Sequence, residues 1–160
     1  SLLAVNELLE KVIKEKREQI EELATEVFIS ITNKPDEYSK VRVKEDYTLD
    51  VIRRDGTSVD NTKLSSGEKE VLAYSFITAL NRSSVTPVPF VMDTPFGHLD
   101  GIHREKLLKN LPGLEVQVFL LATDRDLPLN ERDKIEASLA GEFQINRDQE
   151  AARSYIEEVE

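Results

Sequence analysis

Two short segments contain residues whose types and spacing suit the binding of a phosphate and a divalent cation. Residues 64–69 read Leu-Ser-Ser-Gly-Glu-Lys and stand directly before an apolar helical pattern. The unpaired N–H groups and the positive dipole end of a helix N-terminus attract anions, so Ser65 and Gly67 suit a phosphate contact. In residues 88–95 an apolar strand pattern leads to Asp93, whose carboxylate suits a hydrated Mg²⁺.

Both segments also have ordinary structural explanations. Ser65 followed three residues later by Glu68 is a capping box, which starts many helices. A strand that ends in Asp before a turn is equally common. The continuation from Asp93 to Asp100 is more specific, because it places a second carboxylate seven positions further along a loop that contains Pro and Gly. No Gly-x-x-x-x-Gly-Lys-Ser/Thr sequence occurs in the chain, so the loop that surrounds nucleotide phosphates is missing.

The composition is that of a charged globular domain. Of the 160 residues, 39% are hydrophobic and 32% charged, and the formal net charge is -10. This charge argues against a broad basic surface for DNA, because non-specific DNA affinity depends on Lys and Arg. The absence of cysteine excludes disulfides and thiolate metal sites. No apolar run approaches the ~20 residues of a membrane span and no secretion signal is visible, so we expect a cytoplasmic protein that acts without a membrane.

A long helical pattern covers residues 2–31 and contains neither Gly nor Pro. Its apolar positions approximate a stripe with a repeat of about 3.5 residues, which Lys16 interrupts. Two interpretations fit: an amphipathic helix packed on the same domain, or the root of a coiled coil whose stripe would continue upstream of Ser1. The pattern stops near Pro35, which cannot continue a helix.

The remaining pattern predicts an α/β fold. Alternating apolar and polar residues predict an antiparallel hairpin from residues 40–44 and 48–53. Further helices are predicted at residues 68–80, 103–111 and 131–139, and strands at 88–92, 116–122 and 143–146, with 116–122 buried on both faces. The last segment fits either a helix or a strand through residues 154–156. Alternating strands and helices predict a parallel sheet, with Asp93 and residues 123–124 at the strand ends where ligands bind.

Several segments together resemble a known family. Residues 64–69, 93–100, 103–104 and 120–124 resemble the C-terminal lobe of ABC-type ATPases, in the branch that holds SMC proteins and double-strand-break-repair ATPases. Within that branch the resemblance is greatest to DndD, the ATPase of DNA phosphorothioation systems, and it is strongest over residues 64–127. It implies a parallel sheet with flanking helices and an antiparallel hairpin, with residues 1–32 as the end of a coiled-coil root helix and residues 33–160 as the ATPase lobe.

The resemblance also implies ligands and residue roles. ATP and Mg²⁺ would be the cofactors, an N-terminal lobe would supply the missing Walker A loop, and two protomers would dimerise through ATP. Ser65 and Gly67 would contact the γ-phosphate of ATP held by the opposing protomer, and Asp93 would hold Mg²⁺ through water. The implied nucleotide-binding residues are Leu64, Ser65, Ser66, Gly67 and Glu68; the implied catalytic residues are Asp93, Thr94, Thr123 and Asp124; the implied dimer-interface loop contains Gly97, His98, Leu99 and Asp100.

Two positions depart from the broader family. Thr94 stands where most members place the Glu that orients the attacking water, and a hydroxyl is a poor base at neutral pH. Thr123 stands where they place a His that touches the γ-phosphate. DndD-like sequences share both features. The two histidines, His98 and His103, have no regular spacing to carboxylates, so we predict no metal site from them.

The implied function is ATP binding and hydrolysis in DNA phosphorothioate modification, with DNA and other DNA-modification proteins as partners. Two alternatives stay open. The first is an ATPase of double-strand-break repair or chromosome maintenance that works with a nuclease. The second is a scaffold that opens and closes with ATP without hydrolysing it.

Overall fold

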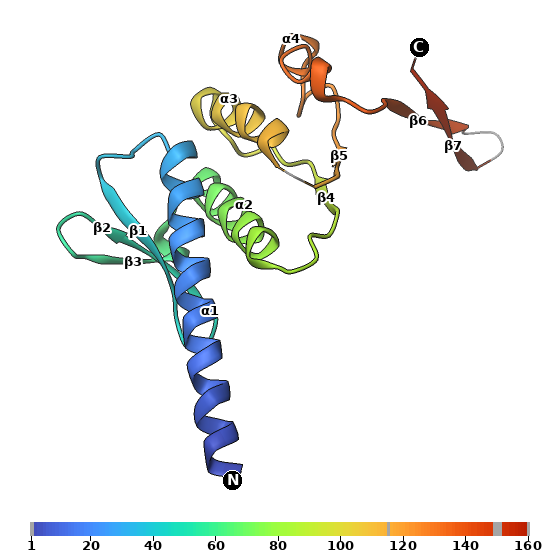
Figure 1. The fold of residues 1–160 in the computed structure, drawn as a ribbon. Helices are drawn as coiled ribbons and strands as arrows, with labels where there is room; N and C mark the ends of the chain where they lie inside the picture. Colours follow the sequence, from blue (N-terminus) through green and yellow to red (C-terminus); the bar gives the residue numbers. More distant parts are fainter. Residues whose placement is uncertain (1, 115, 149–151, 160) are drawn as a thin grey trace.

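The computed structural model describes residues 2–114, 116–148 and 152–159 (Figure 1). In chain order the elements are α1 (Leu2–Ile31), β1 (Tyr38–Val43), β2 (Leu49–Arg53), β3 (Ser58–Asp60), η1 (Asn61–Lys63), α2 (Ser66–Ser83), β4 (Phe90–Asp93), α3 (Gly101–Asn110), η2 (Leu111–Gly113), β5 (Val118–Leu121), α4 (Leu129–Arg132), η3 (Glu136–Ser138), β6 (Phe143–Asp148) and β7 (Arg153–Glu158). This is an α/β architecture, as predicted, with three separate small sheets among the described residues.

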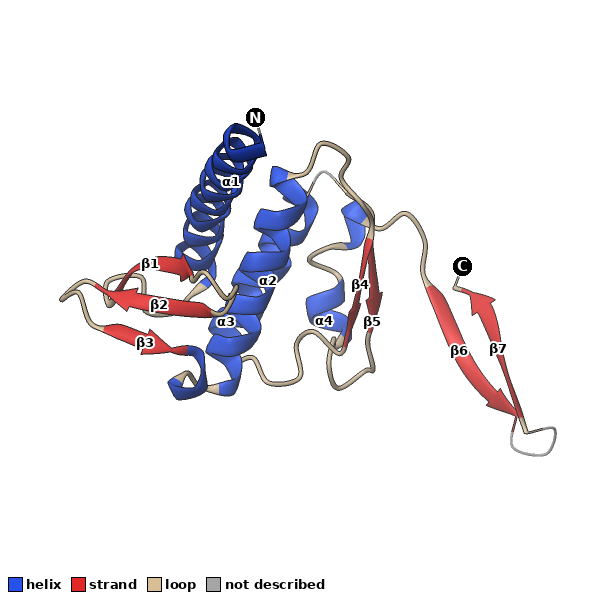
Figure 2. Cartoon of the chain, turned by 90° about the horizontal axis from the view of Figure 1, so that it is seen from below, coloured by secondary structure: helices blue, strands red, loops and turns tan. Residues whose placement is uncertain are grey.

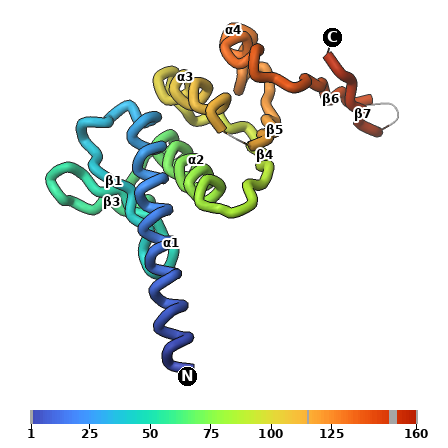
Figure 3. The backbone as a smooth tube through the Cα atoms, viewed as in Figure 1, coloured from blue at the N-terminus to red at the C-terminus, as the bar shows by residue number. Residues whose placement is uncertain are grey.

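The long helix α1 packs on the domain through its C-terminal half only. Ala24, Val27, Phe28 and Ile31 are buried, whereas the large apolar side chains before residue 14 are exposed. Figure 3 shows the N-terminal half of α1 extending away from all other elements. The amphipathic interpretation therefore describes the second half of the helix, and the first half carries an uncovered apolar stripe. Within the described residues, no helix combines the length and apolarity of a membrane span.

The predicted hairpin is confirmed as β1 and β2, paired antiparallel with Val41 opposite Val51. A third strand, β3, extends the sheet next to β2 and was missed by the sequence analysis because it has only three residues. The turn between β2 and β3 contains Gly56 at a φ of 86°, a conformation that favours glycine. Figure 2 shows this sheet lying beside α1 and α2, where its buried residues join the core.

The two strands that carry the candidate site form a parallel pair. β4 pairs with β5, and Asp93 stands opposite Leu121 at their carboxyl ends. The expectation that β5 is buried on both faces was wrong, because Phe119 and Leu121 are each almost half exposed. In the described part of the chain, β4 is the sole strand paired with β5. One face of the pair is uncovered, since Val91, Phe119 and Leu121 are exposed.

Two further sequence predictions need correction. The strand at residues 143–146 was expected in the parallel sheet, but β6 pairs antiparallel with β7 and stands apart from β4 and β5 (Figure 2). The final segment is thus a strand. The helix expected at residues 131–139 is limited to α4 and the short η3, since Ile135 is the one buried side chain in that range and packing stabilises little else.

The core links the candidate site to α1. Phe28 of α1 packs edge-on against Tyr38 of β1, with ring centroids 5.6 Å apart. The same cluster includes Val71 of α2, Leu107 of α3 and Phe96, which lies in the loop after β4. Because Phe96 is fully buried, that loop is held by the core on one side.

Candidate functional site

The first candidate segment, residues 64–68, is here named the serine segment. Ser65 caps α2: its Oγ accepts a hydrogen bond from the N–H of Glu68 at 3.3 Å, and its own N–H donates to Glu68 Oε2 at 2.9 Å. The predicted capping box is therefore confirmed. Leu64 is buried and anchors the segment, whereas Ser65 and Ser66 are exposed at the helix N-terminus, where an anion is favoured.

Glu68 is a buried charge at the centre of the serine segment. Its side chain is 7% exposed and accepts hydrogen bonds from Lys34 Nζ at 2.9 Å and from the Tyr38 hydroxyl at 2.8 Å. Burial alone would raise the pKa of this carboxyl, but the hydrogen bonds from Lys34, Ser65 and Tyr38 outweigh burial and lower the pKa to about 2. Glu68 thus lies inside the domain and not at its surface, although the sequence placed it among nucleotide-binding residues.

The second candidate segment, residues 94–100, is here named the aspartate loop. It lies directly against the serine segment: a Cβ at Gly67 would stand 3.1 Å from the carbonyl oxygen of His98. His98 Nδ1 also lies 2.5 Å from Glu70 Oε1 on α2. The structure therefore brings the two sequence-predicted segments together, and the absent side chain of Gly67 allows their close approach.

The aspartate loop begins with a residue in an unusual conformation. Thr94 has a φ of 47°, which is rare for a β-branched residue. Its N–H donates to the carbonyl of Leu121 at 2.8 Å, and its hydroxyl lies 3.4 Å from Asp93 Oδ1. Such conformations occur at functional sites more often than elsewhere, and here the surrounding hydrogen bonds hold it.

Asp126 holds the middle of the aspartate loop, although no sequence pattern predicted this role. Its Oδ1 accepts the N–H of Phe96 at 3.0 Å, while Arg104 Nη2 donates to the carbonyl of Phe96 at 3.3 Å. Burial raises the pKa of the Asp126 carboxyl. No local spacing reveals this contact, because the two residues are thirty positions apart in the chain.

Asp100 closes the loop as the N-cap of α3. Its Oδ1 accepts the N–H groups of Ile102 and His103, and its Oδ2 accepts from Asn33 Nδ2 at 3.1 Å. The hydrogen bond that Asp100 accepts from the His103 N–H lowers the pKa of the Asp100 carboxyl. His103 is buried and accepts the N–H of Asn33 on Nε2, so its Nδ1 donates to Asp100. His103 is structural, as is the buried Leu99, whereas Gly97, His98 and Asp100 are exposed.

The remaining candidate residues lie at the carboxyl ends of β4 and β5. The predicted parallel pairing places Asp93, Thr123 and Asp124 at the same end of the two strands, and all three are exposed. Mg²⁺ keeps several waters and binds through one or two carboxylates plus substrate phosphates, so a single exposed Asp93 fits that ion. The described residues include no cluster of three or more acidic or histidine side chains that would bind a metal without a phosphate.

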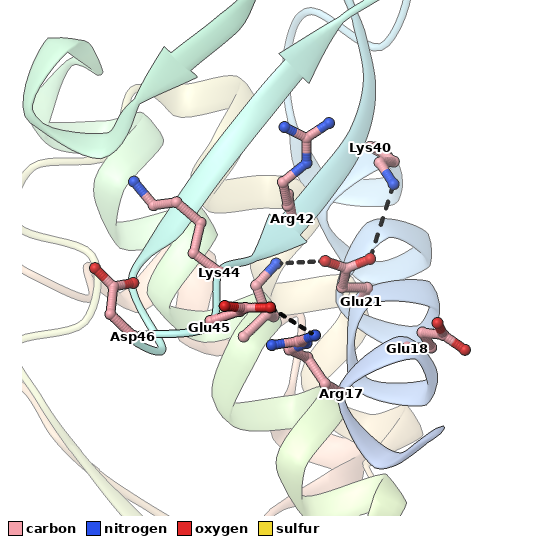
Figure 4. Close-up of a pocket in the computed structure, with 9 residues that line it drawn as sticks. Arg17, Glu18, Glu21, Lys40, Arg42, Lys44, Glu45 and Asp46 are labelled. Atoms are coloured by element: carbon pink, nitrogen blue, oxygen red, sulfur yellow. Dashed lines mark hydrogen bonds and ion pairs between the residues drawn. The ribbon is translucent and has the colours of Figure 1, made fainter. Parts of the chain in front are cut away.

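A separate groove of about 620 Å³ lies between α1 and the β1–β2 hairpin (Figure 4). Its charged lining residues are Arg17, Glu18, Glu21, Lys40, Arg42, Lys44, Glu45 and Asp46. Cations and carboxylates are equally numerous, and several are paired, such as Arg17 with Glu45 and Lys40 with Glu21. The groove is therefore electrostatically balanced and does not resemble an anion site.

Two curated proteins are similar to this chain in sequence. No protein-family model matches the chain. It is 30% identical over 122 residues to the DNA double-strand break repair Rad50 ATPase of Methanopyrus kandleri, and 22% identical over 145 residues to that of Halobacterium salinarum. The matches include 70% and 86% of this chain, but the chain spans only 14% and 16% of those two relatives.

Solved structures of SMC heads share the fold. A chain from work on ATP-driven dimerization and DNA-stimulated activation of SMC ATPases superposes with a TM-score of 0.67 at 15% identity, covering 94% of this chain and 89% of that chain. The Smc head of Pyrococcus furiosus bound to the C-terminal domain of ScpA gives a TM-score of 0.65 at 17% identity, covering 98% of this chain and 40% of that chain. The SMC head of Thermotoga maritima gives a TM-score of 0.57 at 18% identity, covering 89% of this chain and 48% of that chain.

These matches define the class of fold. The chain has the α/β fold of SMC heads, as the sequence resemblance predicted. Together with the Rad50 matches, the fold shows that the chain resembles the C-terminal region of an SMC- and Rad50-like ABC ATPase head. The narrower resemblance to DndD stays a prediction.

Proposed function

We propose that this chain is the C-terminal lobe of an SMC-like ATPase and contacts ATP held by another protomer. The observation that carries the proposal is the packing of Gly67 against the carbonyl of His98, which joins the serine segment and the aspartate loop into one surface. In this proposal, residues 33–160 form the lobe and residues 1–32 the root of a coiled coil. The exposed apolar stripe of α1 supports the second assignment.

The proposed chemistry relies on positioning and charge. The N-terminus of α2, with Ser65 and Gly67, contacts the γ-phosphate across the dimer, and Asp93 holds the hydrated Mg²⁺. The ion, when bound, neutralises developing charge on the phosphate oxygens. Thr94 orients the attacking water but is a weak base, so we expect slow hydrolysis. Thr123 and Asp124 follow the carboxyl end of β5, next to Asp93 at the end of β4, and add further polar groups to the site.

The proposal requires an N-terminal lobe with a Walker A loop, because the chain has none. The uncovered apolar face of β4 and β5, with Val91 and Phe119 exposed, supports further protein packing there. Homodimerisation through ATP then completes two sites. We place the complete protein in the cytoplasm, in contact with DNA.

For the cellular process, the first proposal is DNA phosphorothioate modification. It is supported by the DndD-like pattern of Asp93-Thr94-Pro95 and Thr123-Asp124, and it makes DNA-modification proteins the partners. The second candidate is double-strand-break repair with a nuclease, which the similarity to two Rad50 ATPases favours. Identification of the proteins that co-purify with the complete ATPase separates the two: modification enzymes support the first, and a nuclease supports the second.

Ser65→Arg in the complete protein tests the ATPase proposal. The substitution puts bulk and a charge at the phosphate contact, so ATP-dependent dimerisation in sedimentation should be lost. Ser84→Arg, at the other end of α2, is the matched control and should dimerise normally. Unchanged dimerisation of Ser65→Arg would rule out the assigned contact, and ATP-dependent dimerisation without phosphate release in the unmodified protein would favour the scaffold alternative.

A further inference from the structure

Glu68 binds four donors that come from three parts of the chain. Two belong to Ser65 itself, whose N–H and hydroxyl both reach Oε2, the hydroxyl at 2.8 Å. The third is the hydroxyl of Tyr38 on β1, and the fourth is Nζ of Lys34, in the connection after α1. Lys34 is the sole cation paired with Glu68 within the described ranges. The charge of the buried carboxylate is thus balanced by a residue outside the serine segment.

We propose that Lys34 and Tyr38 are positioning residues for Ser65 and act on it through Glu68. This inference rests on the proposed function, in which Ser65 contacts the γ-phosphate held by a second protomer. It assigns a role to residues that lie outside every sequence-predicted site segment and that do not touch the nucleotide.

The chemistry of a single hydroxyl explains the effect. Ser65 has one O–H to donate, and in this structure Glu68 Oε2 is positioned to accept it. A γ-phosphate must compete with Glu68 for that proton. Lys34 and Tyr38 both donate to the other oxygen, Oε1, and draw negative charge toward it. They weaken the hold of Glu68 Oε2 on the hydroxyl. Ser65 nevertheless stays at the N-cap of α2, because its Oγ also accepts the backbone N–H of Glu68.

The position of Lys34 connects this effect to α1. Lys34 follows the last helical residue, Ile31, by three positions, and its N–H donates to Thr32 Oγ1. Lys106 of α3 donates to the Thr32 carbonyl at 2.6 Å, which holds the end of α1 against the lobe. A displacement of α1 relative to α2 would therefore also alter the Lys34 contact, since the lysine joins the end of α1 to Glu68 on α2.

The test uses the complete ATPase and measures ATP-dependent dimerisation by sedimentation. Lys34→Met removes the charge and keeps the length of the side chain. We expect dimerisation to weaken about tenfold, the size of one coupling between contacting residues. Lys34→Arg should restore most of the affinity. Lys63→Met is the matched control, because Lys63 is exposed close to Ser65 and has no contact with Glu68.

A double-mutant cycle separates positioning from general stability. In a Ser65→Ala background, Lys34→Met should cause almost no further loss, because the hydroxyl on which it acts is gone. The same loss in both backgrounds, or normal dimerisation of Lys34→Met, would overturn the inference. Tyr38→Phe gives a second cycle. This variant removes no charge and keeps the buried ring, so it should fold even if Lys34→Met does not. If the unmodified ATPase shows no ATP-dependent dimerisation, the proposed function itself is wrong.

Discussion

Several residues of the candidate site combine a folding role with a position where chemistry is expected. Ser65 caps α2 and stands exposed at its N-terminus, and Asp100 caps α3 while its carboxylate also binds Asn33. Gly67 permits contact between the two segments because it has no Cβ. The sequence alone predicted the capping box, since both partners lie within three residues. Asp126 and Lys34 escaped prediction because their partners are about thirty residues away.

At the residue scale, the buried Glu68 makes stability depend on pH. Its pKa falls from 4.5 to about 2 on folding, so its stabilising contribution is complete above the unfolded value and disappears as pH falls toward 2. The shift corresponds to about 3 kcal/mol. Glu68→Gln should therefore lower the free energy of unfolding at about pH 7, and the difference from wild type should disappear in acid.

Urea unfolding of both proteins at a series of pH values measures this difference. Glu10→Gln is a suitable control, because Glu10 is an exposed carboxylate on the half of α1 that extends away from the domain. A gap between wild type and Glu68→Gln that stays constant from neutral pH into acid would contradict the assigned role of the carboxylate.

At the scale of elements, the periodicity of the sequence predicted which helices and strands form, but not what packs against them. The long helix, the hairpin and the two strands of the site were all predicted, because their patterns are regular over several residues. The pattern cannot state what covers an apolar face. For that reason the exposed first half of α1, the half-exposed β5 and the separate β6–β7 hairpin emerged only from the structure. The helical pattern at residues 131–139 was misleading, because that segment has little to pack against.

The two halves of α1 should differ sharply in their response to truncation. Phe28 is fully buried against Tyr38, so Phe28→Ala should reduce the free energy of unfolding by about 3–5 kcal/mol. Leu9 is 56% exposed, and Leu9→Ala in the isolated chain should change the free energy of unfolding by no more than about 0.5 kcal/mol. Denaturant titration of the two variants checks this pair. Similar losses would show that the first half of the helix packs on the lobe after all.

At the scale of the whole molecule, the chain supplies one side of a nucleotide site. The serine segment and the aspartate loop are assembled, but the phosphate-surrounding loop is not present in the sequence. We therefore expect this chain alone to bind ATP with a Kd of about 1 mM or weaker, which corresponds to few favourable contacts. Isothermal titration calorimetry measures this directly. Tight, stoichiometric binding would mean that the chain holds a complete nucleotide site of its own.

The most direct measurement is a structure of the complete protein with a slowly hydrolysed ATP analogue. Our account predicts two facing protomers, with Ser65 Oγ of each at about 2.5–3.0 Å from a γ-phosphate oxygen of the nucleotide bound by the other. Asp93 should lie at the same nucleotide with Mg²⁺ between them through water. A dimer in which Ser65 stays bonded to Glu68 and faces solvent, with the nucleotide elsewhere, would contradict the account.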